Sequence, residues 1–218
     1  MSIWEDIGSN YLEAASSAFP LHRLAVFGVA VLCSLVADCH EYLSVIESLA
    51  RMPVSEIIDL DYGPISELVV WNIFAGIFAT YGAALAKHLI TSVLFSQVAK
   101  ITKFRDKTEA AVRAFPPSQL MSLKDRKRAL EIIDAGLEGP KKNLKNFACI
   151  AEMFYGFSLV FLFACYWGNI LDLMLSVFFG TLAIFLAIKS VFVFLREYFA
   201  PALFRSQLVG GRAPDMSD

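Results

Sequence analysis

Two ionisable side chains lie inside long apolar stretches, where a charge is costly unless it has a partner or a function. Glu152 follows Lys145 by seven residues, and Lys189 precedes Arg196 by seven. In a helix, seven residues span about 10 Å. Because both residues would then lie at a similar depth, we predict an intramembrane ion pair between Glu152 and Lys189. The alternatives are that Lys189 extends toward the headgroups, or that these residues conduct protons or ions.

A third polar side chain, Asn72, also lies in an apolar stretch and could form a hydrogen bond to another helix. Elsewhere the sequence offers no recognisable chemistry. It contains no Walker loop, GxGxxG, HExxH, GxSxG or paired-carboxylate motif. The three histidines form no triad pattern, and the four cysteines have no CxxC spacing. We therefore predict that the chain is not an enzyme and that it binds no cofactor and no metal.

The composition indicates lipid as the solvent for most side chains. Hydrophobic residues make up 57% of the 218 positions and charged residues only 18%, whereas soluble domains average roughly 45–50% and about 25%. A soluble protein of this length could not bury so much apolar surface. This excludes an ordinary soluble domain.

The apolar stretches predict an all-α membrane protein with four transmembrane helices. A span needs roughly 20 mainly apolar residues to cross the hydrocarbon layer. The predicted spans cover residues 20–37, 68–87, 146–168 and 171–195. The second and fourth spans are apolar on all sides, which argues against a soluble helical bundle. The third and fourth spans are joined by Gly168-Asn169-Ile170 and should form a tight antiparallel hairpin.

The charges that flank the spans predict their orientation. Between residues 98 and 145 there are twelve basic residues, whereas the loop 38–67 has seven acidic residues and only Arg51 as a basic one. Lys and Arg stay preferentially on the cytoplasmic side. The basic segment and both termini are therefore predicted to be cytoplasmic, and the acidic loop to lie outside. We expect the membrane to be the plasma membrane of a bacterium, its inner membrane.

The parts outside the spans are predicted to be helical and cytoplasmic, apart from the acidic loop. Residues 1–19 show an amphipathic pattern typical of an interfacial helix. Residues 88–145 form a basic helical layer, in which the helix of the second span continues as far as Pro116-Pro117. A second helix then runs from about Ser122 until Gly139-Pro140 ends it. Residues 196–218 form a cytoplasmic tail.

A basic patch, defined as Lys124, Arg126, Lys127 and Arg128, lies in this layer. It could orient the chain and bind anionic lipid, or it could bind an acidic cytoplasmic protein. Nucleic acid is not an expected partner, because no recognition pattern accompanies the charges. Small residues recur every four positions in the spans, which lets helices approach closely, and we expect a homo-oligomer in contact with membrane lipids.

In length, number of spans and basic cytoplasmic layer, the chain resembles the four-span membrane subunit of bacterial anti-phage defence systems of the Kiwa type. The resemblance implies a cytoplasmic effector partner and a role in defence. We expect a non-enzymatic, oligomeric membrane subunit that anchors or signals to a cytoplasmic partner. One alternative is an ion channel or proton-conducting subunit. Another follows from a similarity in layout to small toxin-immunity proteins of the inner membrane.

Overall fold

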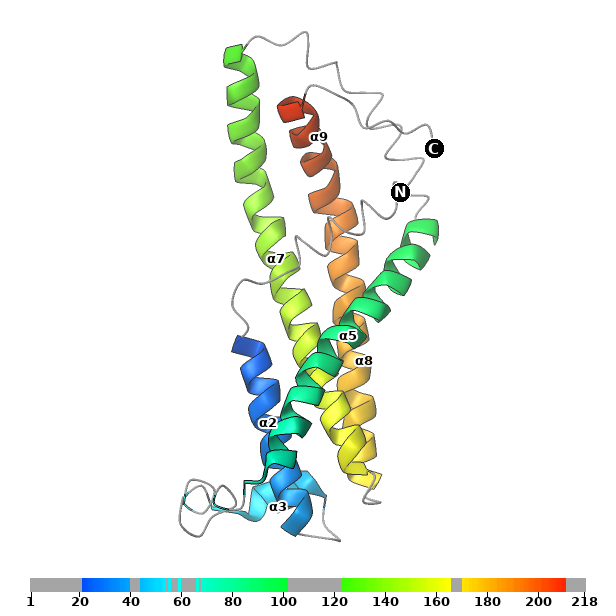
Figure 1. The fold of residues 1–218 in the computed structure, drawn as a ribbon. Coiled ribbons are helices and arrows are strands. Elements are labelled where there is room, and N and C mark those ends of the chain that lie inside the picture. Colours follow the sequence, from blue (N-terminus) through cyan, green and yellow to red (C-terminus); the bar gives the residue numbers. More distant parts are fainter. Residues whose placement is uncertain are drawn as a thin grey trace. The chain divides into compact units, whose positions relative to one another are not determined.

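The structure, a computed structural model, describes residues 21–39, 44–53, 68–101, 123–165 and 170–210, together with Ser55, Asp59 and Ser66. These residues are almost all helical, and none of them lies in a strand (Figure 1). The elements are α2 (Leu21–Cys39), α3 (Val45–Arg51), α5 (Val70–Ile101), α7 (Leu123–Ala164), α8 (Ile170–Val193), the π-helical turn η4 (Phe194–Tyr198) and α9 (Phe199–Gly210). The predicted all-helical class is confirmed for these residues. The helix predicted for residues 1–19 and the end predicted at Pro116-Pro117 lie outside them.

Three helical stretches are long and apolar enough to cross a membrane: Val70–Val98, Lys124–Ala164 and Ile170–Ala202. The apolar part of α2, Leu21–Val36, is shorter. Large apolar side chains remain exposed along α5 and α8, among them Trp71, Phe74, Phe78, Leu85, Met174, Val177, Phe178 and Phe185. Soluble monomers rarely expose contiguous apolar surface of this extent. The described helices therefore indicate a membrane protein.

The chain divides into two compact units. The first contains the described residues within 18–90 and 149–186 and is called the bundle unit below. The second contains the described residues within 91–148 and 187–218 and is called the arm unit. Each of α5, α7 and α8 contributes to both units.

In the bundle unit, side-chain contacts show that neighbouring helices run in alternating directions. A β-carbon added at Gly76 of α5 would lie 2.7 Å from the Phe27 ring of α2, and Asn72 bonds Ser34 of α2, so α2 and α5 are antiparallel. The helices α5 and α7 are also antiparallel. Their contacts pair Gly82 with Leu159 and Phe78 with Phe163.

Small buried residues let these helices pack closely. Gly156 of α7 faces Val26 of α2, and a β-carbon there would lie 2.5 Å from a Val26 methyl group. The hydroxyls of Ser158 on α7 and Ser176 on α8 each donate to the other residue's backbone carbonyl, at 2.9 and 2.8 Å. Two apolar clusters fill the bundle. One includes Val26, Ala30, Cys33, Ala79 and Val160, and the other Ala83, Ala151, Tyr155 and Ala183.

The predicted helix end at Gly139-Pro140 is wrong. The helix α7 runs without interruption for 42 residues, with Pro140 in its interior (Figure 1). Proline removes one backbone donor and crowds the carbonyl four residues earlier, here that of Gly136. Both Gly136 and Gly139 are exposed, so water can bind the freed carbonyl. Gly139 also has no β-carbon, which relieves the usual clash between proline and the residue before it.

Two helices continue beyond the predicted spans. As expected, α5 continues past residue 87, and the structure describes it to Ile101. The helix after residue 195 continues through η4 and α9 to Gly210, where only a tail was predicted. The π-helical turn is marked by the Phe199 N–H, which donates to the Phe194 carbonyl five residues earlier. Pro201 lies one turn later and has no N–H for the carbonyl of Glu197, so the wider turn accommodates the proline.

Candidate functional site

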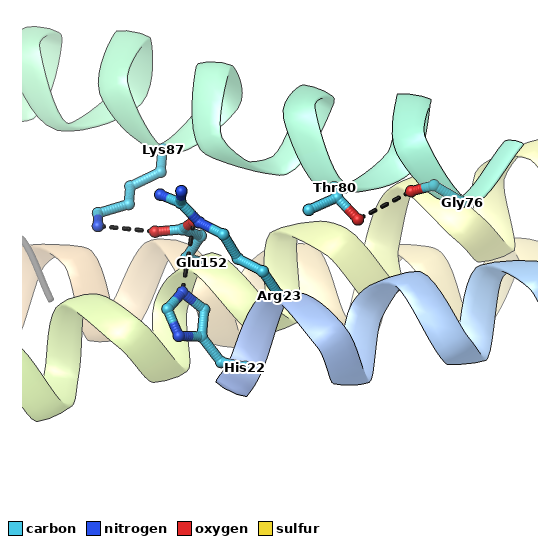
Figure 2. A network of polar contacts seen from close by, with 6 residues as sticks. All are labelled: His22, Arg23, Gly76, Thr80, Lys87 and Glu152. Carbon is cyan, nitrogen blue, oxygen red and sulfur yellow. Dashed lines mark hydrogen bonds and ion pairs between the residues drawn. The ribbon is translucent and has the colours of Figure 1, made fainter. Parts of the chain in front are cut away.

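The bundle unit contains a carboxylate that binds two cations from two other helices. Glu152 lies on α7, and its side chain is only 3% exposed. Its Oε1 accepts a hydrogen bond from Nε of Arg23 on α2 at 2.6 Å, and its Oε2 accepts one from Nζ of Lys87 on α5 at 2.9 Å (Figure 2). These three residues are called the Glu152 cluster below. The cluster ties α2, α5 and α7 together through one buried group.

A histidine lies beside the cluster. Nε2 of His22 is 3.4 Å from Oε1 of Glu152 (Figure 2). This nitrogen is buried, and within the described part of the chain it makes no hydrogen bond. The contact is therefore a weak electrostatic one. With His22 neutral, two cations and one carboxylate leave the cluster with a formal charge of +1.

The two cations differ in exposure. The Lys87 side chain is 14% exposed, whereas that of Arg23 is 48% exposed. Arg23 uses Nε toward Glu152, and guanidinium carries two further NH₂ groups. Exposed leucines lie on the same two helices, Leu21 and Leu24 on α2 and Leu85 and Leu89 on α5. The cluster therefore combines a buried ion pair with a half-exposed cation on helices that also expose apolar side chains.

Sequence reasoning missed the partners of Glu152. It assigned neither Arg23 nor Lys87 to Glu152. Lys87 is the last residue of the predicted second span, and Arg23 lies three residues inside the start of the first. If alternate spans run in opposite directions, as predicted, those ends lie at the same depth as Glu152. Position relative to the span ends was therefore the signal that could have identified them.

Lys189 belongs to the arm unit. Its ammonium lies 4.8 Å from the ring centroid of Phe147, a favourable cation–π distance. The expected ion pair between Glu152 and Lys189 stays a prediction. The cations that the structure places on Glu152 are Arg23 and Lys87.

Asn72 is fully buried in the first turn of α5. Its Nδ2 donates to Oγ of Ser34 on α2 at 2.9 Å, and its Oδ1 accepts from the backbone N–H of Val69 at 3.0 Å. The sequence predicted a hydrogen bond between helices for this residue, and the structure contains one. The amide both caps the start of α5 and fastens it to α2. Its polar groups are thereby satisfied within the bundle.

A second buried carboxylate, Asp172, was not singled out from the sequence. It lies in the first turn of α8, where its Oδ2 accepts from the Val45 N–H of α3 at 3.3 Å. Its Oδ1 is buried and makes no hydrogen bond within the residues that the structure covers. Cys33, a buried free thiol, is close enough to interact with it electrostatically. No group of three or more His, Cys, Asp or Glu in the described ranges could hold a metal ion.

An apolar cavity of about 670 Å³ lies in the bundle unit between α2, α5 and α7. Its lining includes Ala30 and Cys33 of α2, Trp71, Phe78 and Tyr81 of α5, and Phe163 of α7. Several of the lining aromatics are exposed. The cavity is thus a groove open to the surroundings, and its walls suit an apolar chain.

The basic patch begins α7. Lys124, Lys127 and Arg128 are exposed, and Arg126 is half-buried. The first turns of a helix carry a partial positive charge, so cations there are unfavourable by roughly 0.3–1 kcal/mol each. Asp125 is the acidic residue in the first turn. The patch therefore does not stabilise its own helix through the dipole, and its three exposed cations are Lys124, Lys127 and Arg128.

The chain was compared with models of protein families, with curated proteins and with solved structures. None of them matches it.

Proposed function

We propose that the chain is a four-span protein of the bacterial inner membrane that anchors an acidic cytoplasmic protein and signals to it. The observation that carries this proposal is the continuity of α7. One helix of 42 residues, about 63 Å long, contains both Glu152 and the basic patch. About 30 Å of that length suffices to cross the hydrocarbon layer. The remainder projects from the membrane and presents the patch.

The packing of α2 supports four spans. Its apolar part is short, but α2 accompanies α5 from the Glu152 cluster to the hydrogen bond between Ser34 and Asn72. Those contacts on α5 extend from Lys87 to Asn72, almost the whole of the predicted second span. A helix of 19 residues is about 28 Å long. It therefore reaches across most of the layer beside its neighbour.

The alternating helix directions also suit a chain that crosses the membrane repeatedly. The pairs α2–α5 and α5–α7 are antiparallel. The third connection, from α7 to α8, is short and its helices are joined by the bonds between Ser158 and Ser176. If the basic patch is inside, four spans would leave both ends of the chain in the cytoplasm.

Signalling would use α7 as a lever. Glu152 is held by α2 and α5, and the basic patch belongs to the same continuous helix. A rearrangement of the Glu152 cluster would therefore move the patch. The exposed apolar faces of α5 and α8 are available for a second copy of the chain, in keeping with a homo-oligomer.

The partner can be tested by photocrosslinking in living cells. A photoreactive residue at Ile132, which is exposed on α7, should give one product with a cytoplasmic protein. Changing the four residues of the basic patch to Glu should abolish that product. Reversal of Lys141 and Lys142, exposed cations on the same helix, is the matched control and should leave it unchanged. A product that survives reversal of the patch would refute anchoring through these charges.

The rival function is ion conduction, and current recordings from the purified chain distinguish it from anchoring. In planar bilayers the purified protein should pass no current above the background. Currents that disappear in the Glu152→Gln variant would refute the anchoring function and assign the cluster to a conduction path. We also propose that the chain acts in phage defence. Cells that carry the chain and its neighbouring genes should then reduce phage plating, and changing the basic patch should remove this protection.

A further inference from the structure

We propose that Arg23 and Lys87 bind the phosphate of an anionic phospholipid in the inner leaflet. The inference rests on the proposed placement of the span ends but not on the cytoplasmic partner. Its first support is charge. Two cations share the single carboxylate of Glu152, which leaves a formal charge of +1 beside the apolar layer. An excess charge at that depth favours a counterion.

Geometry shows where the counterion would bind. The Arg23 side chain is 48% exposed although its acceptor, Glu152, is almost wholly buried. Its bond to Glu152 is made through Nε, so the two terminal NH₂ groups are donors that can bind phosphate oxygens. Lys87 is less exposed and contributes mainly its charge. Arg23 is therefore the group that touches the phosphate.

The surroundings favour a lipid over a free anion. The two helices that carry the cations expose apolar side chains, among them Leu24, which follows Arg23 on α2, and Leu85 and Leu89 on α5. This apolar surface would contact acyl chains, whereas a site for free phosphate is lined by polar groups. A phospholipid satisfies both features at once, because its phosphate meets the cations and its chains cover exposed apolar surface of the same two helices. The cytoplasmic leaflet, in which the proposal places these cations, is rich in anionic lipid.

Native mass spectrometry of the purified full chain can measure this preference. The chain is released from nanodiscs that hold equal amounts of phosphatidylglycerol and phosphatidylcholine, and the retained lipids are counted. Phosphatidylglycerol should be retained about fivefold more, since one Lys or Arg near an anionic lipid contributes about 1 kcal/mol. Arg23→Gln should abolish this preference. Arg51→Gln, which removes an exposed arginine on α3, is the matched control and should retain it.

Two further variants separate binding from folding. Arg23→Lys keeps the charge and should keep most of the preference. Glu152→Gln raises the formal charge of the cluster from +1 to +2 and should increase the preference even though it destabilises the bundle unit, whereas a purely structural role predicts a weaker preference. Equal retention of both lipids by the native chain would overturn the proposal. So would full displacement of the lipid by millimolar inorganic phosphate, which would assign the site to a free anion.

Discussion

Replacing Glu152 by Gln should destabilise the bundle unit strongly. The substitution keeps the size and one acceptor oxygen but leaves Arg23 and Lys87 without a counter-charge. Removing one partner of a buried pair typically costs about 3–5 kcal/mol. The Lys87 side chain is close to that regime, whereas Arg23 is half exposed and its share falls to about 1 kcal/mol or less. We therefore expect a loss of about 3 kcal/mol, mostly from Lys87.

The loss can be measured by titrating SDS into dodecylmaltoside micelles and following helix content by circular dichroism. In a thermal melt in the same detergent, the loss corresponds to a fall of about 6–12 °C. Glu138→Gln makes the same chemical change at an exposed position of α7 and should stay within about 0.5 kcal/mol of the native chain.

A second change tests the cause. If the unpaired Lys87 ammonium is what destabilises the Glu152→Gln variant, then adding Lys87→Met should recover part of the stability. In the native background, Lys87→Met should destabilise, because Glu152 loses one of its donors. The two substitutions should thus couple by about 2 kcal/mol. Additive losses, or a Glu152→Gln variant as stable as the Glu138→Gln control, would refute the view that the ion pair holds the three helices.

Three further predictions use the same SDS titration. Asn72→Ala removes the buried amide that joins α5 to α2 and should cost about 1 kcal/mol; no loss would mean that the bond is dispensable. Gly156→Ala places a β-carbon 2.5 Å from Val26 and should cost about 1–3 kcal/mol, whereas Gly136→Ala meets open space and should stabilise by roughly 0.5–1 kcal/mol; equal effects would contradict the close packing. Pro140→Ala restores a backbone donor inside α7 and should raise stability by up to about 3 kcal/mol, while a decrease would show that the proline is required.

Much of the helical layout could be predicted from the sequence, because long apolar stretches with basic flanks permit few alternatives. Continuation of α5 beyond the second span followed from its periodic apolar positions. The need for a cation near Glu152 also followed, since a lone buried carboxylate is costly. The identity of the cations did not. Several Lys and Arg residues lie at similar distances from the span ends. Which of them pairs with Glu152 depends on the register between helices, and the position of one residue along its own span does not specify that register.

Residues that usually end a helix were the other source of wrong predictions. Gly139-Pro140 is typical of a helix end, but proline is compatible with a helix when the residue before it has no β-carbon and the freed carbonyl is exposed. The π-helical turn before Pro201 absorbs a second proline in a different way. Asp172 was not singled out, because it lies near the predicted start of the fourth span and no pattern in the sequence indicates the contact with α3 that buries it. Local backbone geometry decided the two proline cases, and a tertiary contact decided the case of Asp172.

The Glu152 cluster has a consequence for how the chain is made. Its members are far apart in the chain, since Glu152 follows Lys87 by 65 residues and Arg23 by 129. At a synthesis rate of about 5–20 residues per second, Arg23 waits roughly 6–26 s for its acceptor. During that interval the first two hydrophobic segments have left the ribosome with unneutralised cations, which must stay among the lipid headgroups. In the proposed four-span arrangement, the early segments would reach their final depth only when the third one enters the bilayer, so assembly of the bundle would wait until most of the chain has been translated.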